Sequence, residues 1–288
     1  MNFVLFHMGN ELPDHFKYCV RQIKYTNPNS NIHIITNLNV SDDSVQIINT
    51  KDLSVPDIGD YFMGDTYELL WRTSILRLFY IQDFLSKSNI EDIIHFDNDI
   101  VLYKNLDEYK DRFSKFNFLI TPRRETEYVF GFSYIKNANS LFNLNEHLLY
   151  LVRRGNKELE KMLGSFPHEM RLLNFINQKN NMKFIDHLPV VPSGPGSDNF
   201  DLFEICFDPA TYGMHVGGSH MLGPHNPYYV PTPDWHGTEK HHYAGEQIAS
   251  NKIKVIFEGK IPKIIYNNNV YEICNLHIHT KKLEDFIT

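Results

Sequence analysis

A pair of aspartates one residue apart stands near the middle of the chain, directly after an apolar run. Residues 93–102 read IIHFDNDIVL, so a short buried strand is predicted to end at Asp97 and Asp99. In open α/β sheets, ligands bind beyond the carboxyl ends of the strands. Carboxylate oxygens suit Mg²⁺ or Mn²⁺, which proteins commonly share with substrate phosphates. The pair therefore predicts a divalent-cation site that could neutralise the charge on a departing diphosphate.

The elements before this pair alternate between strand and helix patterns. A strong helix with apolar residues at 3.6-residue spacing is predicted over 69–85. A second helix is predicted over 12–24, and strands over 3–6, 32–35 and 45–48. Alternating strands and helices favour an α/β fold whose central sheet is mostly parallel and covered by helices on both faces.

The second half of the chain is less regular. Strands are predicted over 117–121, 128–135, 183–185, 253–257 and 261–266, and helices over 138–153 and 168–177. Between them, residues 189–245 are rich in Gly, Pro, His, Tyr and Asp. A loop region of this length within a domain is usually functional, and its aromatic and polar side chains suit a sugar. No repeat or polar linker divides the sequence, so residues 1–288 are expected to form one domain.

Composition excludes several classes of protein. Of the 288 residues, 42% are hydrophobic and 14% aromatic, which is too apolar for a disordered chain. The net charge of −7 gives no basic excess for binding nucleic acid. The 3 cysteines are widely spaced, so neither a disulfide framework nor a structural zinc site is expected. No apolar run is long enough for a signal peptide or a membrane span, and a soluble cytoplasmic protein is expected.

The helix that carries Arg77, followed by the apolar run with its D-x-D, resembles the metal-dependent glycosyltransferases of the GT-A fold. The resemblance is closest to the glycogenin and lipopolysaccharide-galactosyltransferase type and covers about residues 3–185. It implies a Rossmann-like GT-A fold with a loop-rich C-terminal acceptor region. Residues 1–125 would bind a nucleoside-diphosphate sugar, most simply a UDP-sugar, with Mn²⁺ or Mg²⁺. Residues 126–288 would bind the glycan or glycoprotein acceptor and close the metal site.

The resemblance also implies roles for residues at the predicted metal site. Asp99 would be the main metal ligand, and Asp97 would contact the metal or the ribose. Asn98, between them, would face the donor. Arg77, with Arg72, would reach the sugar or the diphosphate.

Two further donor contacts are suggested by position alone. His7 and Thr36 stand just past the first two predicted strands, where the family places the nucleotide. Gly131 interrupts the predicted strand 128–135 and would allow the backbone to approach the donor closely.

Later segments would complete the site. Glu169 opens a predicted helix and would be the acceptor-side carboxylate that orients or deprotonates the acceptor hydroxyl. Asp208, in the loop region, is a second candidate carboxylate. Near the C-terminus, His277 and His279 would point to the same face of a strand. By likeness to the family's C-terminal His and Lys, His279 is favoured as the metal ligand, and Lys281 would neutralise the diphosphate.

Two other functions fit the same residues. In phosphatases of the haloacid-dehalogenase type, D-x-D follows an apolar strand, and Asp97 would be the nucleophile with Asp99 as general acid. Those enzymes carry the motif near the start of the chain and have a later acidic motif, and neither feature is seen here. The other alternative is a non-catalytic module that binds carbohydrate or nucleotide, which the sequence leaves open.

Overall fold

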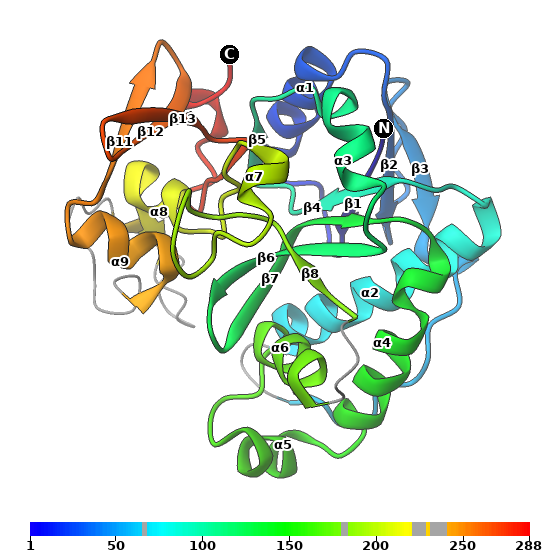
Figure 1. Cartoon of the computed structure of the whole chain (residues 1–288). Coiled ribbons are helices and arrows are strands. Elements are labelled where there is room, and N and C mark those ends of the chain that lie inside the picture. Colours follow the sequence, from blue (N-terminus) through cyan, green and yellow to red (C-terminus); the bar gives the residue numbers. More distant parts are fainter. Residues whose placement is uncertain (65–67, 180–183, 221–228, 231–240) are drawn as a thin grey trace.

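The computed structural model describes residues 1–64, 68–179, 184–220, 229–230 and 241–288, and Figure 1 shows its central sheet. Seven strands form this sheet in the order β3-β2-β1-β4-β7-β6-β8. The first four are parallel to one another, β7 is antiparallel to both β4 and β6, and β8 is parallel to β6. The bounds are β1 (Asn2–His7), β2 (Asn31–Thr36), β3 (Gln46–Asn49), β4 (Ile93–Phe96), β6 (Phe118–Arg124), β7 (Glu127–Ile135) and β8 (Asp186–His187).

Helices cover both faces of this sheet, as the strand pattern predicted. Alternate residues of β1 enter two different apolar cores, with Phe3 and Leu5 in one and Val4 in the other. Figure 1 shows α1 above the sheet and α2, α4 and α6 below it. The described helices are α1 (Phe16–Thr26), α2 (Glu68–Ser88), α3 (Lys110–Phe113), α4 (Ala138–Val152), α5 (Asn156–Leu163), α6 (Glu169–Lys179), α7 (Phe200–Phe203), α8 (Tyr212–Gly217) and α9 (Tyr243–Ala249), with 3-10 turns η1 (Thr50–Asp52), η2 (Leu106–Tyr109) and η4 (Leu283–Asp285). The predicted α/β fold class is confirmed.

The C-terminal segment returns to the middle of the chain. Strand β14 (Asn275–His277) pairs antiparallel with β5 (Ile100–Leu102), and His277 lies opposite Ile100. This register places the end of β14 beside the D-x-D, which immediately precedes β5. The remaining described strands are β11 (Ile253–Glu258), β12 (Ile261–Tyr266) and β13 (Asn269–Glu272) in one antiparallel sheet, and β9 (Ser219–His220) with β10 (Tyr229–Val230) in another.

The structure departs from the prediction mainly in the second half. The described part of the predicted loop region contains α7, α8 and the start of α9, whereas residues 221–228 and 231–240 lie outside the described residues. The predicted strand 183–185 is replaced by the shorter β8, which begins at Asp186, and residue 183 also lies outside the described part. Within the described segments, no helix combines the length and the apolar character that crossing a membrane requires.

Candidate metal and donor site

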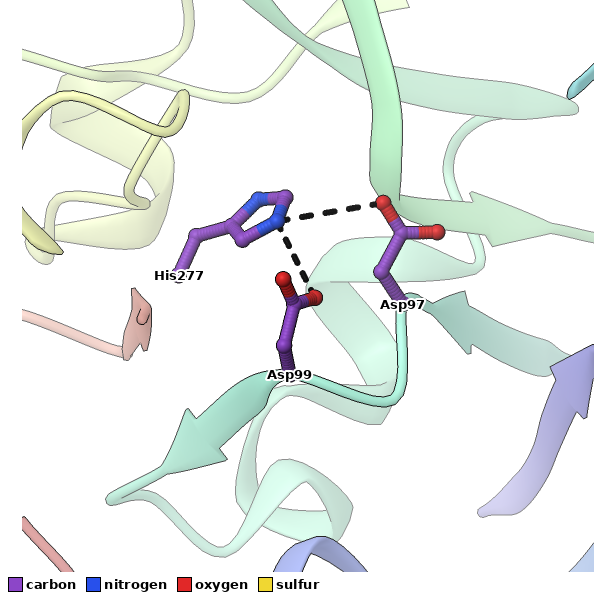
Figure 2. A group of neighbouring side chains, drawn as sticks. All are labelled: Asp97, Asp99 and His277. Atoms are coloured by element: carbon purple, nitrogen blue, oxygen red, sulfur yellow. Dashed lines mark ion pairs between the residues drawn. The ribbon is translucent and has the colours of Figure 1, made fainter. Parts of the chain in front are cut away.

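Three metal-ligating side chains meet where β4, β5 and β14 come together (Figure 2). The ligand atoms of Asp97, Asp99 and His277 all lie within 4.8 Å of one another, and we call these three residues the metal group. His277 Nε2 is 3.1 Å from Asp99 Oδ1 and 4.0 Å from Asp97 Oδ2. Two carboxylates and one imidazole converging on one point form a donor set that fits a divalent cation.

Backbone hydrogen bonds fix the D-x-D from both sides. The amide of Asp97 donates to the carbonyl of Gly131 on β7 at 2.9 Å. The carbonyl of Asp99 accepts from the amide of Ile278, just past β14, at 2.8 Å. The turn between β4 and β5 is therefore held by two elements, and both carboxylates are directed to the same place.

Gly131 lies directly against this group. A Cβ atom at this position would be 2.7 Å from Asp97 Oδ2 and 3.3 Å from the Cε1 of His277. Real Cβ atoms do not come so close, so a side chain here would displace the carboxylate. The glycine therefore makes room for the cluster itself, and its contact with the donor stays a prediction.

Lys281 forms an ion pair with the carboxylate of Asp99. Its backbone has a φ of +63°, a left-handed conformation that is uncommon for residues other than glycine. The turn is closed by the Lys281 amide, which donates to the carbonyl of Ile278 at 3.0 Å. This strained turn brings the ammonium back over Asp99, and backbone strain of this kind gathers at functional sites.

Arg77 lies on α2 and joins two carboxylates. Its guanidinium pairs with Asp97, and its second terminal nitrogen donates to both oxygens of Glu169, at 3.1 and 3.0 Å. Glu169 is the first residue of α6 and its side chain is only 5% exposed. Arg77 thus connects the N-terminus of α6 to the D-x-D.

The charges of the cluster follow from these contacts. Burial opposes ionisation of Asp99, but His277 and Lys281 outweigh it and hold the pKa of Asp99 well below its usual range. Burial likewise opposes ionisation of Asp97, and Arg77 and His277 lower its pKa overall. Both carboxylates are therefore negatively charged at neutral pH, as cation binding requires.

Burial raises the pKa of Glu169 to about 7, although Arg77 opposes the rise. In the unfolded chain the ordinary value is 4.5, so between these values the folded state holds a proton that the unfolded state has released. This contribution to stability is complete below pH 4.5 and is lost as the pH rises through about 7.

We therefore expect Glu169→Gln to change the pH dependence of folding. The free energy of unfolding of the wild type, minus that of Glu169→Gln, should fall as the pH rises from 4.5 to 7. Taking the difference cancels the contribution of the buried histidines to the free energy of unfolding, because it is the same in both proteins. Urea denaturation at several pH values measures it, and a difference that does not change with pH would contradict the raised pKa.

Asp208 is fully buried and does not face the site. Its Oδ1 accepts from the amides of Thr211 (2.6 Å) and Tyr212 (2.8 Å), and its Oδ2 accepts from those of Gly213 (2.8 Å) and His277 (2.9 Å). These four bonds favour a positioning role over the catalytic role that the sequence suggested, because the carboxylate holds the backbone of His277. Helix α8 also packs closely against the backbone of His277, since a Cβ on Gly213 would lie 2.0 Å from the carbonyl oxygen of His277.

Asn98 lies at the centre of a second polar group beside the D-x-D. Its amide nitrogen is 3.3 Å from His7 Nδ1, and its amide oxygen is 3.1 Å from His15 Nε2. His7, at the end of β1, also contacts the carbonyl of Glu11 at 2.8 Å. The structure thus brings His7 and Asn98 together as the sequence placed them. His15 was missed, although its position before the first helix, beyond the first strand, could have suggested it.

Thr36 and Arg72 make hydrogen bonds within their own segments of the chain. Thr36 is fully buried at the end of β2, and its hydroxyl accepts from the amide of Leu38 at 3.3 Å. Arg72 donates to the carbonyls of Gly59 (2.9 Å) and Tyr61 (2.7 Å). Neither residue belongs to the metal group, and the donor contacts expected of them stay predictions.

The histidine in the metal group is His277, whereas the sequence favoured His279. Strand β14 ends at His277, and the ring of His279 stacks on that of His277 with centroids 4.6 Å apart and planes at 26°. His279 was favoured by likeness to the family's C-terminal His and Lys, whereas the group within 4.8 Å contains His277. The register with β5 moves the assignment to His277.

No family model matches the sequence, and no curated protein matches it. Solved glycosyltransferases are among the structures that match it. Mouse xyloside xylosyltransferase 1, in its apo form, is 12% identical with a TM-score of 0.43, over 66% of this chain and 86% of that one. The galactosyltransferase LgtC, in complex with donor and acceptor sugar analogues, is 11% identical with a TM-score of 0.40, over 87% and 94%. The PaToxG glycosyltransferase is 17% identical with a TM-score of 0.38, over 62% and 68%. Likeness at this level concerns the fold alone.

Proposed function

We propose that this chain is a metal-dependent glycosyltransferase that moves a sugar from a nucleoside-diphosphate sugar to a hydroxyl of a glycan or glycosylated acceptor. The observation that carries the proposal is the convergence of Asp97, Asp99 and His277, with Lys281 against Asp99. Two ionised carboxylates, an imidazole and a primary ammonium in one place suit a cation and a diphosphate together.

The donor set favours an oxygen-preferring cation. Asp97 and Asp99 offer carboxylate oxygens, which suit Mg²⁺ and Mn²⁺, and His277 adds a single nitrogen. When bound, the cation would neutralise negative charge on the diphosphate of the donor. We propose Mn²⁺ or Mg²⁺ as that cation and a UDP-sugar as the donor.

Lys281 would then stabilise the leaving diphosphate. Its side chain is 43% exposed, so the ammonium can move from Asp99 to a phosphate oxygen without losing a buried position. Positive groups held ready where charge develops usually contribute most to catalysis. Asn98, with His7 and His15, offers hydrogen-bonding groups to the nucleotide or the sugar.

Glu169 would act through Arg77. Both of its oxygens accept from the guanidinium, and its side chain is 5% exposed, which leaves little access for an acceptor hydroxyl. Its place suits the task of fixing Arg77, which in turn orients Asp97. We therefore propose that Glu169 positions Arg77. This role is proposed in addition to the acceptor-side role expected from the place of Glu169 on α6.

Thermal unfolding with UDP- and GDP-sugars, each with and without Mn²⁺, tests the proposal. One donor at about 100 times its Kd should stabilise the folded chain by about 2.7 kcal/mol, or roughly 4–5 °C, only when Mn²⁺ is present. That donor should also release its nucleoside diphosphate over time. If no donor stabilises the chain, or if a simple phosphoester is hydrolysed without any sugar nucleotide, the glycosyltransferase proposal is wrong.

A further inference from the structure

The metal group has two basic partners, one for each of its carboxylates. Asp97 pairs with Arg77, and Asp99 pairs with Lys281. Figure 2 shows both carboxylates directed toward the ring of His277, where a cation would bind. The two carboxylates that a cation needs are therefore already paired with positive charges of the chain itself.

These two partners differ in how firmly they are held. The side chain of Arg77 is 12% exposed, and its second terminal nitrogen donates to both oxygens of Glu169, at 3.1 and 3.0 Å. The side chain of Lys281 is 43% exposed, and among the described residues its one ionic partner is Asp99. Water can therefore solvate the ammonium of Lys281 as it leaves, whereas Arg77 would leave a buried carboxylate behind. Of the two, Lys281 is the partner that can be exchanged.

Asp99 cannot serve the lysine and a cation at the same time. Its side chain is 4% exposed, with Oδ1 3.1 Å from His277 Nε2 and Oδ2 paired with Lys281. A divalent cation on Asp99 would lie beside the ammonium, and like charges repel each other strongly where little water screens them. Binding of the cation therefore requires Lys281 to move away from Asp99.

The backbone keeps Lys281 close to the metal group after its ammonium has moved. The amide of Lys281 donates to the carbonyl of Ile278 at 3.0 Å, and the amide of Ile278 donates to the carbonyl of Asp99 at 2.8 Å. The ammonium can therefore turn on its flexible stem but stays within the length of one side chain of this turn. Water is a weak new partner for it, whereas the phosphates of a ligand bound to the cation would be strong ones.

We propose that Lys281 competes with the cation for Asp99, and that a diphosphate ends this competition by taking the ammonium. A cation alone is then held weakly, and the cation and the nucleotide strengthen each other's binding. Such coupling is reciprocal, so it can be measured from the side of the cation. The part of the inference that concerns the diphosphate rests on the proposed function, whereas the competition for Asp99 does not.

Titration of the full chain with Mn²⁺ alone, followed by electron paramagnetic resonance of the free ion, tests the competition without any turnover. Lys281→Met removes the ammonium and keeps an apolar stem, so it should lower the Kd for Mn²⁺ at least about fivefold. Lys281→Arg keeps a positive charge and should bind Mn²⁺ no more tightly than the wild type. Lys115→Met is the matched control, since Lys115 is exposed in the turn before β6, and should leave the Kd unchanged. Circular dichroism checks that each variant is folded.

Repeating the titrations with saturating UDP tests the part played by the diphosphate. The Mn²⁺ that UDP binds in solution is measured without protein and subtracted. The Kd for Mn²⁺ without UDP, divided by the Kd with UDP, gives the coupling between the two ligands. A cation that bridges protein and phosphate contributes to this coupling in every variant. The coupling should nevertheless be at least about fivefold smaller in Lys281→Met than in the wild type, because no ammonium is released from Asp99.

The outcomes separate the role of Lys281 from the glycosyltransferase proposal. The inference is overturned if Lys281→Met and the wild type bind Mn²⁺ alone equally tightly, if Lys281→Arg binds it as tightly as Lys281→Met, or if the coupling to UDP is the same in Lys281→Met and the wild type. If the expected differences are found but no sugar is transferred, the competition stands and the glycosyltransferase proposal fails. If neither protein binds Mn²⁺, both fail.

Discussion

Replacing Asp99 with Asn is expected to lower metal-dependent donor binding and sugar transfer by at least about 100-fold. Asp99 contacts two other members of the site, His277 and Lys281, and its side chain is 4% exposed. Loss of a residue that only supports a metal ligand typically lowers the affinity for the metal 10–100-fold. Loss of the charged ligand itself should therefore lower this affinity at least about 100-fold. The side-chain amide of the variant would also direct N–H donors toward His277 and Lys281, which are themselves hydrogen-bond donors or cations.

Titration with Mn²⁺, alone and with the stabilising sugar nucleotide, measures this effect together with release of the nucleoside diphosphate. The fold should survive, because the partly exposed ammonium of Lys281 can turn to water when Asp99 is neutral. Asp43→Asn is the matched control, since Asp43 is exposed in the loop before β3. Turnover of Asp99→Asn within threefold of the control would show that this carboxylate does not hold the cation.

The features that could be predicted from sequence are those encoded in short segments. The apolar run before Asp97 and Asp99 identified a strand end, and the periodicity of residues 69–85 identified α2. Arg72 could have been separated from Arg77 by the same periodicity. Five residues along a helix correspond to about 500° of rotation, which leaves the two side chains about 140° apart. Only one of them can face the D-x-D.

The remaining features depend on contacts between distant segments. The choice between His277 and His279 is made by the pairing of β14 with β5, and no local pattern gives that register. The role of Asp208 likewise appears only when α8 and β14 meet, because its partners come from both. The contacts of Glu127 follow the same rule, since Arg171 reaches it from α6.

Arg77→Met is expected to destabilise the folded chain by about 2–3 kcal/mol at pH 9, where Glu169 is ionised in the wild type and would lose its partner. The guanidinium is 12% exposed and pairs with both Asp97 and Glu169. Most of the cost should come from Glu169, which is 5% exposed, because Asp97 is 28% exposed and keeps access to water. Urea denaturation at pH 9 measures the loss of unfolding free energy.

A second substitution shows whether the unpaired carboxylate is the cause. In Arg77→Met/Glu169→Gln the buried charge is removed along with its partner, so the double variant should recover at least about 1 kcal/mol relative to Arg77→Met alone. Lowering the pH from 9 to 5 should also reduce the penalty of Arg77→Met, because Glu169 is protonated at pH 5 in both proteins and no longer needs a partner. If instead the two single effects simply add and the penalty is the same at both pH values, Arg77 stabilises the fold through its contact with the ring of Phe130 rather than through the two carboxylates.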